Sequence, residues 1–167
     1  MWKKVTAAFG VLPAQKEVVR KMIELGLRID EAGSIRCGDV EIKEISLAKS
    51  AGVDRRAVRA TVEGIMNDRY LRQVFLRIRP AGALLQDVSV LMGFGVVEIE
   101  ADAKQFGIIA KATSLLAEKK ISIRQVFAKD PELYENPTLV IIAERELPGN
   151  IINEFKKIKG VRKVSVY

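Results

Sequence analysis

Three arginines within five consecutive residues are the side chains of this sequence best suited to specific chemistry. Arg55, Arg56 and Arg59 follow directly after the motif Ala-Gly-Val-Asp at 51–54. On a helix they would lie on the outer face, within about the first one and a half turns. A guanidinium group pairs with phosphate oxygens and makes bidentate hydrogen bonds to guanine. This cluster therefore indicates contact with DNA.

The segment that must position these arginines predicts a helix-turn-helix. Residues 44–66 form two short helices joined by a glycine turn. The first helix runs from about Lys43 to Ser50, and Gly52 takes the positive φ of the turn. Asp54 is a good N-cap for the second helix, which then presents its arginines as a recognition helix does. The alternative is a helical hairpin with a solvated basic face, since arginine favours exposed helices.

The remainder of the N-terminal half is predicted to be mostly helical, with a winged-helix-like layout. Helices are expected at 2–9, from Pro13 to about Gly26, at 69–78 and at 83–92. A hairpin near 34–42 has Gly38-Asp39 at its tip. The last two helices are expected either to pack on one of the domains or to pair two subunits. We place the domain boundary at residue 93, which gives an N-terminal domain of residues 1–93 and a C-terminal domain of residues 94–167.

The C-terminal half predicts a ferredoxin-like sandwich, so the fold class is α+β. The order of elements is βαββαβ, with strands at 96–101, 121–128, 138–143 and 161–166 and helices at 107–119 and 148–158. Two helices then cover one face of a four-stranded antiparallel sheet, and the other face is free for a second copy or a ligand. Gln125 breaks the alternation of its strand, which a local bulge or an interface role would explain.

The charge of the chain is positive and unevenly distributed. The formal net charge is +7, and 49% of the residues are hydrophobic and 29% charged. Residues 1–93 contain 16 Lys and Arg against 11 Asp and Glu, whereas residues 94–167 contain 12 against 10. The excess therefore lies in the N-terminal half and favours a polyanionic partner for it.

Composition also excludes several function classes. The chain contains no histidine and one cysteine, Cys37. Ser-His-Asp and Cys-His catalysis and a His/Cys zinc site are therefore not available, and no nucleophile has a plausible base. We expect no enzyme activity, no cofactor and no metal. The predicted strands VVEIEA and TLVIIA offer no aromatic side chains on which RNA bases would stack.

The expected location is the cytoplasm. A lone cysteine cannot form an internal disulfide, and no run of 18 apolar residues predicts a membrane-spanning helix. The basic N-terminus is not followed by the continuous apolar core of a signal peptide.

The C-terminal half resembles a known family of ligand-sensing modules. The stretch VVEIEADAKQFGIIAKATSLLAEKKISI is similar to the first half of an ACT domain, and the resemblance covers about residues 95–167. Together with the helix-turn-helix at 44–66 and IRQVFAKDPEL at 123–133, the chain resembles archaeal proteins described as ACT-containing regulators of amino-acid metabolism. The resemblance implies a homodimer joined through the ACT domain and DNA binding that responds to a small effector of the amino-acid type.

The family's ligand loop lies between the first strand and the first helix of the ACT domain. Its pattern has Asp three residues before a Gly and Pro directly before that Gly. Here the Gly is Gly107, but Lys104 and Phe106 occupy the other two positions, and Asp102 lies two residues earlier. Because of this departure, the pattern alone does not predict that the loop makes the family's usual contact with an amino acid.

The loop still has groups that suit an anionic ligand. The amides of Gly107 and Ile108 open a helix and would bind a carboxylate, with Lys104 adding positive charge. In ACT dimers the second strand of the partner often completes the pocket, which nominates Gln125. The alternative is that Asp102 and Lys104 are loop-surface residues, Gln125 is a satisfied interface amide and the domain only dimerises.

Two functions follow from these observations. The first is a transcriptional regulator of amino-acid metabolism, which binds DNA through the N-terminal helices and dimerises and senses a metabolite through the ACT domain. The second is a non-DNA-binding allosteric or scaffold subunit that docks on a metabolic enzyme.

Overall fold

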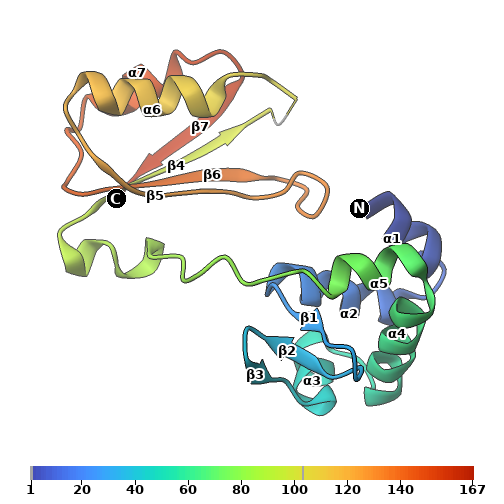
Figure 1. Cartoon of the computed structure of the whole chain (residues 1–167). Helices are drawn as coiled ribbons and strands as arrows, with labels where there is room; N and C mark the ends of the chain where they lie inside the picture. The colour runs from blue at the N-terminus through green and yellow to red at the C-terminus, as the bar shows by residue number, and fades with distance from the viewer. Residues whose placement is uncertain (1, 103) are drawn as a thin grey trace. The chain divides into compact units, whose positions relative to one another are not determined.

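The chain forms two compact units, Met1–Gly82 and Ala83–Tyr167 (Figure 1). The computed structural model describes residues 2–102 and 104–167. The sequence predicts a boundary at residue 93, but residues 83–93 make their contacts within the C-terminal unit. With the boundary after Gly82, the net charges of the two units differ more than the sequence prediction implied. The N-terminal unit has 16 Lys and Arg against 10 Asp and Glu, a net charge of +6.

The N-terminal unit combines five helices with a small antiparallel sheet in its described part. The helices are α1 (Trp2–Phe9), α2 (Pro13–Glu24), α3 (Glu44–Ala51), α4 (Arg55–Asn67) and α5 (Arg69–Phe75), and the strands are β1 (Arg28–Ile29), β2 (Ile35–Cys37) and β3 (Val40–Glu41). The predicted hairpin is confirmed as β2 and β3. The sequence did not reveal β1, which pairs with β2 through Ile29 and Ile35.

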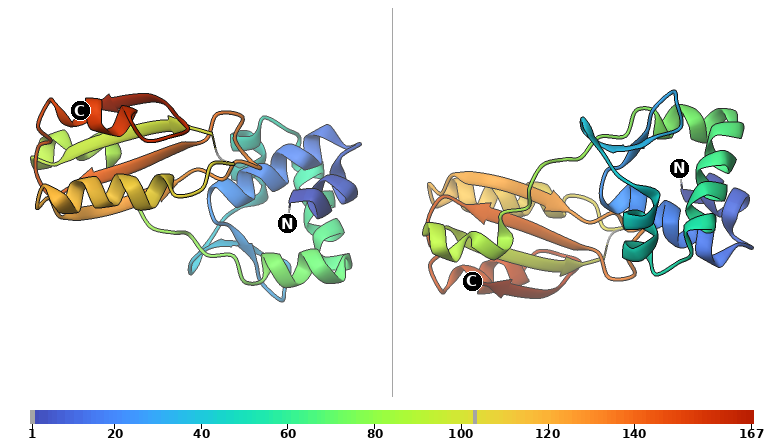
Figure 2. Two further views of the ribbon diagram at one scale, coloured as in Figure 1. Left: turned by 90° about the horizontal axis from the view of Figure 1, so that it is seen from above. Right: turned by 90° about the horizontal axis from the view of Figure 1, so that it is seen from below.

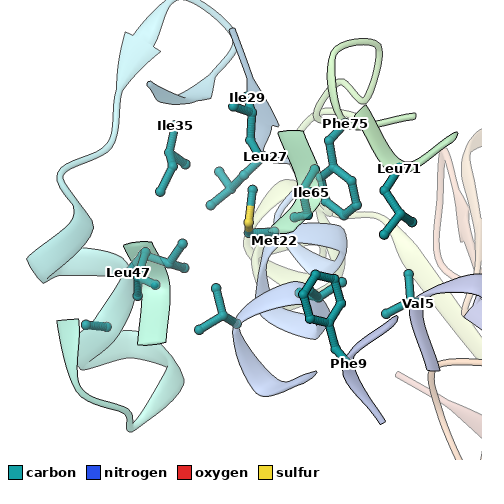
Figure 3. Close-up of a cluster of buried hydrophobic side chains, with 14 residues drawn as sticks. Val5, Phe9, Met22, Leu27, Ile29, Ile35, Leu47, Ile65, Leu71 and Phe75 are labelled. Carbon is teal, nitrogen blue, oxygen red and sulfur yellow. The ribbon is translucent and has the colours of Figure 1, made fainter. Parts of the chain in front are cut away.

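All five of these helices contribute to one apolar core (Figure 3). Met22 of α2, Leu47 of α3 and Ile65 of α4 are each no more than 2% exposed. Full burial of such a side chain stabilises a fold by about 1.5–3 kcal/mol. The core therefore fixes α3 against α4. Leu25 lies outside this core, because α2 ends at Glu24 and the Leu25 side chain is 49% exposed.

The turn between α3 and α4 confirms the prediction in detail. Gly52 adopts the left-handed conformation with φ 65°, and the Val53 N–H donates to the Ala48 carbonyl at 3.0 Å. Asp54 caps α4 by accepting a hydrogen bond from the Arg56 N–H at 2.7 Å. The two helices are thus held by a rigid turn as well as by the core.

The C-terminal unit has the strand order of the predicted ferredoxin-like sandwich. Its elements are η1 (Gln86–Val88), η2 (Val90–Met92), β4 (Gly95–Ala101), α6 (Ile108–Glu118), β5 (Ile123–Ala128), β6 (Thr138–Ala143), α7 (Ile151–Lys156) and β7 (Val161–Val166). The sheet order is β5-β6-β4-β7 with all neighbours antiparallel. Figures 1 and 2 show α6 and α7 together on one face of this sheet.

A bulge in β5 explains the polar residue in that strand. Ile123 lies opposite Ala143, but Gln125 lies opposite Ile142, so the register shifts between them. The shift turns Gln125 to the face of the sheet opposite α6 and α7. Ile123 packs against the core under the helices.

The second face of the sheet is covered in part by the chain itself. We call residues 83–94 the strap; Figure 1 shows it on the side of the sheet opposite α6 and α7. Leu85 and Phe94 of the strap pack against Val96, Val140 and Ile142. The expectation that this face is entirely free is therefore wrong.

The predicted helix at 83–92 is also wrong, because the strap contains only the two short 3₁₀ turns η1 and η2. The Ala83 carbonyl, which a helix would pair with its own backbone, accepts a hydrogen bond from Gln125 Nε2 at 2.9 Å. The Leu85 N–H donates to Gln125 Oε1 at 3.1 Å. A side chain of the sheet thus takes the Ala83 carbonyl that the predicted helix would use, and it also fixes the Leu85 N–H.

Within the described residues, no helix has the length and apolar character needed to cross a bilayer.

Gly52 and Gly26 have the same backbone conformation but different surroundings. Alanine variants at the two positions therefore measure the cost of the left-handed backbone with and without a steric clash. Gly52 and Gly26 both have φ 65°, but a Cβ on Gly52 meets nothing within 4 Å, whereas one on Gly26 lies 2.6 Å from Pro80 Cα. We predict that Gly52→Ala lowers the free energy of unfolding by about 1–2 kcal/mol, the cost of the left-handed conformation. We predict that Gly26→Ala lowers the free energy of unfolding by about 1–3 kcal/mol more than Gly52→Ala, because backbone atoms must move to make room for the Cβ. Urea denaturation measures both values, and equal losses contradict the contact at Pro80.

Candidate functional site

The three arginines of α4 are all exposed, as the sequence predicts. The buried face of α4 consists of Val58, Thr61 and Ile65. At about 100° per residue, Arg56 lies on the side of the helix opposite these residues. Arg55 and Arg59 lie one turn apart on a flank of the helix, with side chains 58% and 59% exposed. The N-terminal half of α4 therefore offers a basic surface to solvent.

The sequence did not reveal that a carboxylate lies beside two of these arginines. Glu44, the first residue of α3, accepts a hydrogen bond from Arg55 Nε at 2.7 Å and one from Arg59 Nη2 at 3.4 Å, both at Oε2. The hydrogen bond from Arg55 is the main cause that lowers the pKa of the Glu44 carboxyl, with Arg59 adding to it. The fixed packing of α3 on α4 brings these three side chains together.

Other basic side chains near α4 have no such partner. Lys43 and Lys49, at the two ends of α3, are exposed. Throughout residues 2–102 and 104–167, neither these lysines nor Arg56 forms an ion pair with a carboxylate. Elsewhere in the N-terminal unit, Arg36 is paired with Asp30, and Arg72 with Glu31.

A pocket of about 630 Å³ lies in the C-terminal unit beside the N-terminus of α6. Most of its lining is apolar and comes from β4, the loop before α6, the first turn of α6 and the β5–β6 connection; the apolar side chains are Ile99, Ala101, Phe106, Ile108, Ile109, Ala110, Ala128, Pro131, Pro137 and Leu139. Asp102, Gln105 and Lys129 add polar groups. Gly107 has φ 82° and opens α6 without a capping side chain. The pocket thus combines apolar walls with the N-terminus of a helix, whose amides attract anions.

The structure brings three of the five predicted ligand-binding residues to this pocket: Asp102, Gly107 and Ile108. Lys104 lies in the same loop but does not line the pocket. Its N–H donates to Asp102 Oδ1 at 2.9 Å, so Asp102 also shapes the loop. Gln125 does not line the pocket within its own chain, and its amide is occupied by the strap.

Thr138 is the one pocket residue with an unpartnered buried hydroxyl among the described side chains. Along β6, Leu139 and Ile141 pack under the helices, whereas Val140 and Ile142 pack on the other face. Alternation therefore turns the Thr138 side chain away from α6 and α7. Its hydroxyl is not a group that the pocket offers to a ligand.

Phe106 and Lys129 are pocket residues that the sequence did not suggest. Phe106 lies two residues before the start of α6 and is 91% exposed, which is unusual for a large apolar side chain. Lys129 follows β5 and lies with its Nζ 5.6 Å from the centre of the Tyr134 ring. The turn-forming residues of segment 130–137 indicate a loop between β5 and β6. Nothing in that sequence indicates that the loop borders a pocket.

The described residues contain no group of three or more His, Cys, Asp or Glu side chains that would hold a metal ion.

Comparison with known proteins gives only remote similarity. No family model matches the sequence, and no curated protein matches it significantly. One similar solved structure is an AsnC family transcriptional regulator from Agrobacterium tumefaciens, with 13% identity, coverage of 92% of this chain and 86% of that chain, and a TM-score of 0.30. AsnC from E. coli has 14% identity, coverage of 78% and 81%, and a TM-score of 0.25. These TM-scores do not establish a shared fold.

The Glu44 cluster predicts a pH dependence of stability. Because the Glu44 pKa is lowered in the folded chain, its stabilising contribution is fully present above the ordinary value of about 4.3. The contribution is lost as the pH falls through the lower, folded pKa. We expect carbon-detected NMR titration to give a lowered Glu44 pKa that returns toward the ordinary value in Arg55→Gln. An ordinary pKa in the unmodified protein would show that the ion pair does not form in solution.

Proposed function

We propose that this protein is a DNA-binding transcriptional regulator of amino-acid metabolism. The N-terminal unit binds duplex DNA through α4, and the C-terminal unit joins two chains and binds a small effector. The observation that carries the proposal is the exposed basic surface at the N-terminal end of α4, formed by Arg55, Arg56 and Arg59.

The geometry of α3 and α4 supports DNA binding. A recognition helix enters the major groove with its N-terminal residues toward the bases, while the preceding helix crosses the backbone. Arg56 points directly away from the core at this end of α4, and Lys43 and Lys49 lie exposed at the two ends of α3. Arginine suits base recognition and lysine suits phosphate. The net charge of +6 on the N-terminal unit favours approach to DNA.

The pocket beside α6 supports an amino acid with an apolar side chain as effector. The amides of Gly107 and Ile108 would bind its carboxylate, and Asp102 would pair with its ammonium group. The apolar walls, including Ile99 and Leu139, would then enclose its side chain. In this proposal the ligand loop works with Asp102 in a different position from that of the ACT pattern.

The strap supports a homodimer. Its outer surface exposes an unusual number of large apolar side chains: Leu84, Val88, Val90, Leu91 and Met92, of which Leu91 is 88% exposed. Several exposed large apolar side chains within one short segment are typical of protein interfaces. We propose that two copies of the C-terminal unit meet over the sheet face that carries the strap. The same apolar surface would serve the alternative function, docking on a metabolic enzyme.

The DNA-binding proposal predicts a specific loss in a triple variant. Replacing Arg55, Arg56 and Arg59 by alanine should weaken binding to duplex DNA by at least about tenfold at low salt and flatten its dependence on salt concentration, because fewer counterions are released. The matched control replaces Arg69, Arg77 and Arg79, which are exposed on or just after α5. Fluorescence anisotropy against KCl concentration measures both variants. Equal losses would show that net charge, and not α4, determines binding.

The effector proposal predicts stabilisation by a subset of amino acids. A ligand at about 100 times its Kd stabilises the folded state by about 2.7 kcal/mol, which raises the Tm by several degrees. We expect leucine, isoleucine, valine, methionine or phenylalanine to produce this shift, and Asp102→Asn to reduce it. Glu118→Gln, at the far end of α6, is the control. A thermal-shift screen of all common amino acids without any response would leave the C-terminal unit a dimerising role only.

A further inference from the structure

We propose that Glu44 is an internal competitor of DNA phosphate for Arg55 and Arg59, and that it weakens binding to DNA of the wrong sequence. The inference deepens the proposed function and rests on it. It assigns a role in specificity to a residue that lies outside the recognition helix.

The geometry resembles the pairing of arginines with a phosphate oxygen. One oxygen, Glu44 Oε2, accepts hydrogen bonds from two guanidinium groups, at 2.7 Å from Arg55 Nε and 3.4 Å from Arg59 Nη2. The two arginine side chains are 58% and 59% exposed, so a phosphate would reach them from solvent. Glu44 is only 30% exposed, and so lies deeper than the groups it contacts.

Glu44 cannot easily leave this position when DNA arrives. It is the first residue of α3, where the helix dipole favours a negative charge. The helix in turn is fixed by Leu47 and Ala48, which are 2% and 4% exposed. A phosphate that approaches Arg55 or Arg59 therefore meets a carboxylate that a fixed backbone holds beside both arginines, and must compete with it for the same donors.

This competition acts mainly on binding that depends on phosphate contacts alone. Such sequence-independent binding is almost entirely electrostatic, so neutralising two of the three arginines of α4 weakens it strongly. At a correct site, hydrogen bonds to base edges offer a second partner to a guanidinium group, and a bidentate contact replaces what Glu44 provided. Glu44 therefore raises the ratio of specific to non-specific affinity.

Glu44 could also have the opposite role and favour DNA binding. The two roles predict changes of opposite sign in DNA affinity when Glu44 is removed. If Glu44 mainly holds Arg55 and Arg59 in the orientation that DNA requires, its removal disorders them and weakens binding. If Glu44 competes with phosphate, its removal strengthens binding.

The test compares Glu44→Gln with Glu41→Gln on random-sequence duplex DNA. Glu41 is exposed, lies near Glu44 and lines the same hollow of about 380 Å³ in the N-terminal unit, but forms no ion pair among the described residues. Both variants change the net charge equally. We expect Glu44→Gln to bind roughly threefold to tenfold more tightly than Glu41→Gln at low salt, with a steeper dependence of affinity on salt.

A second variant removes the effect of net charge altogether. Glu44→Asp keeps the charge at the start of α3 but withdraws the carboxylate from the arginines, so it should also bind random DNA more tightly than the unmodified protein. Circular dichroism checks that both Glu44 variants are folded. If Glu44→Gln binds no more tightly than Glu41→Gln, or more weakly than the unmodified protein, the inference is overturned while DNA binding stands. If none of these proteins binds duplex DNA at low salt, the proposed function itself fails.

Discussion

The packing of α3 against α4 is the contact on which the functional argument depends. Leu47 and Ala48 on α3 and Val58 and Ile65 on α4 are all buried in one core, and Gly52 closes the turn between the helices. This arrangement determines which face of α4 remains in solvent. It also sets the distance between the start of α3 and the start of α4, so that Glu44 meets Arg55. Both the basic surface and the carboxylate beside it are therefore consequences of the same buried contact.

The C-terminal unit uses its sheet in two different ways. Under α6 and α7 the sheet supports an apolar core, and at one end of that layer the loop before α6 borders the pocket. On the opposite face, Gln125 holds the strap by two hydrogen bonds to its backbone. The strap follows directly in the chain after the segment that leaves the N-terminal unit. The proposed ligand pocket and the strap thus share no residue.

Local signals in the sequence predicted the elements whose form depends on local chemistry. Gly52 and Asp54 specified the turn and the cap of α4, because a positive φ and an N-terminal hydrogen bond favour these residue types. The misplaced Gln125 indicated a bulge, because alternation along a strand has a strict period of two.

Features that depend on distant partners could not be predicted in this way. The apolar spacing of Leu84, Leu85, Val88 and Leu91 indicated a helix, but Gln125, 42 residues along the chain from Ala83, takes the carbonyl that the helix would use. The contact of Glu44 with Arg55 spans 11 residues and a turn, so its existence depends on how the helices cross. Likewise, the departure of the loop at Lys104 and Phe106 from the expected pattern gave no indication that Lys129 borders the same pocket.

The most direct test of the account is to observe the guanidinium groups of α4 while DNA is added. NMR resolves the Nε–H signals of Arg55, Arg56 and Arg59 in the intact protein, and single substitutions assign them. The account predicts that duplex DNA shifts these three signals, while the signal of Arg145 in the C-terminal unit stays in place. Unchanged signals from α4 at DNA concentrations that saturate binding would contradict it.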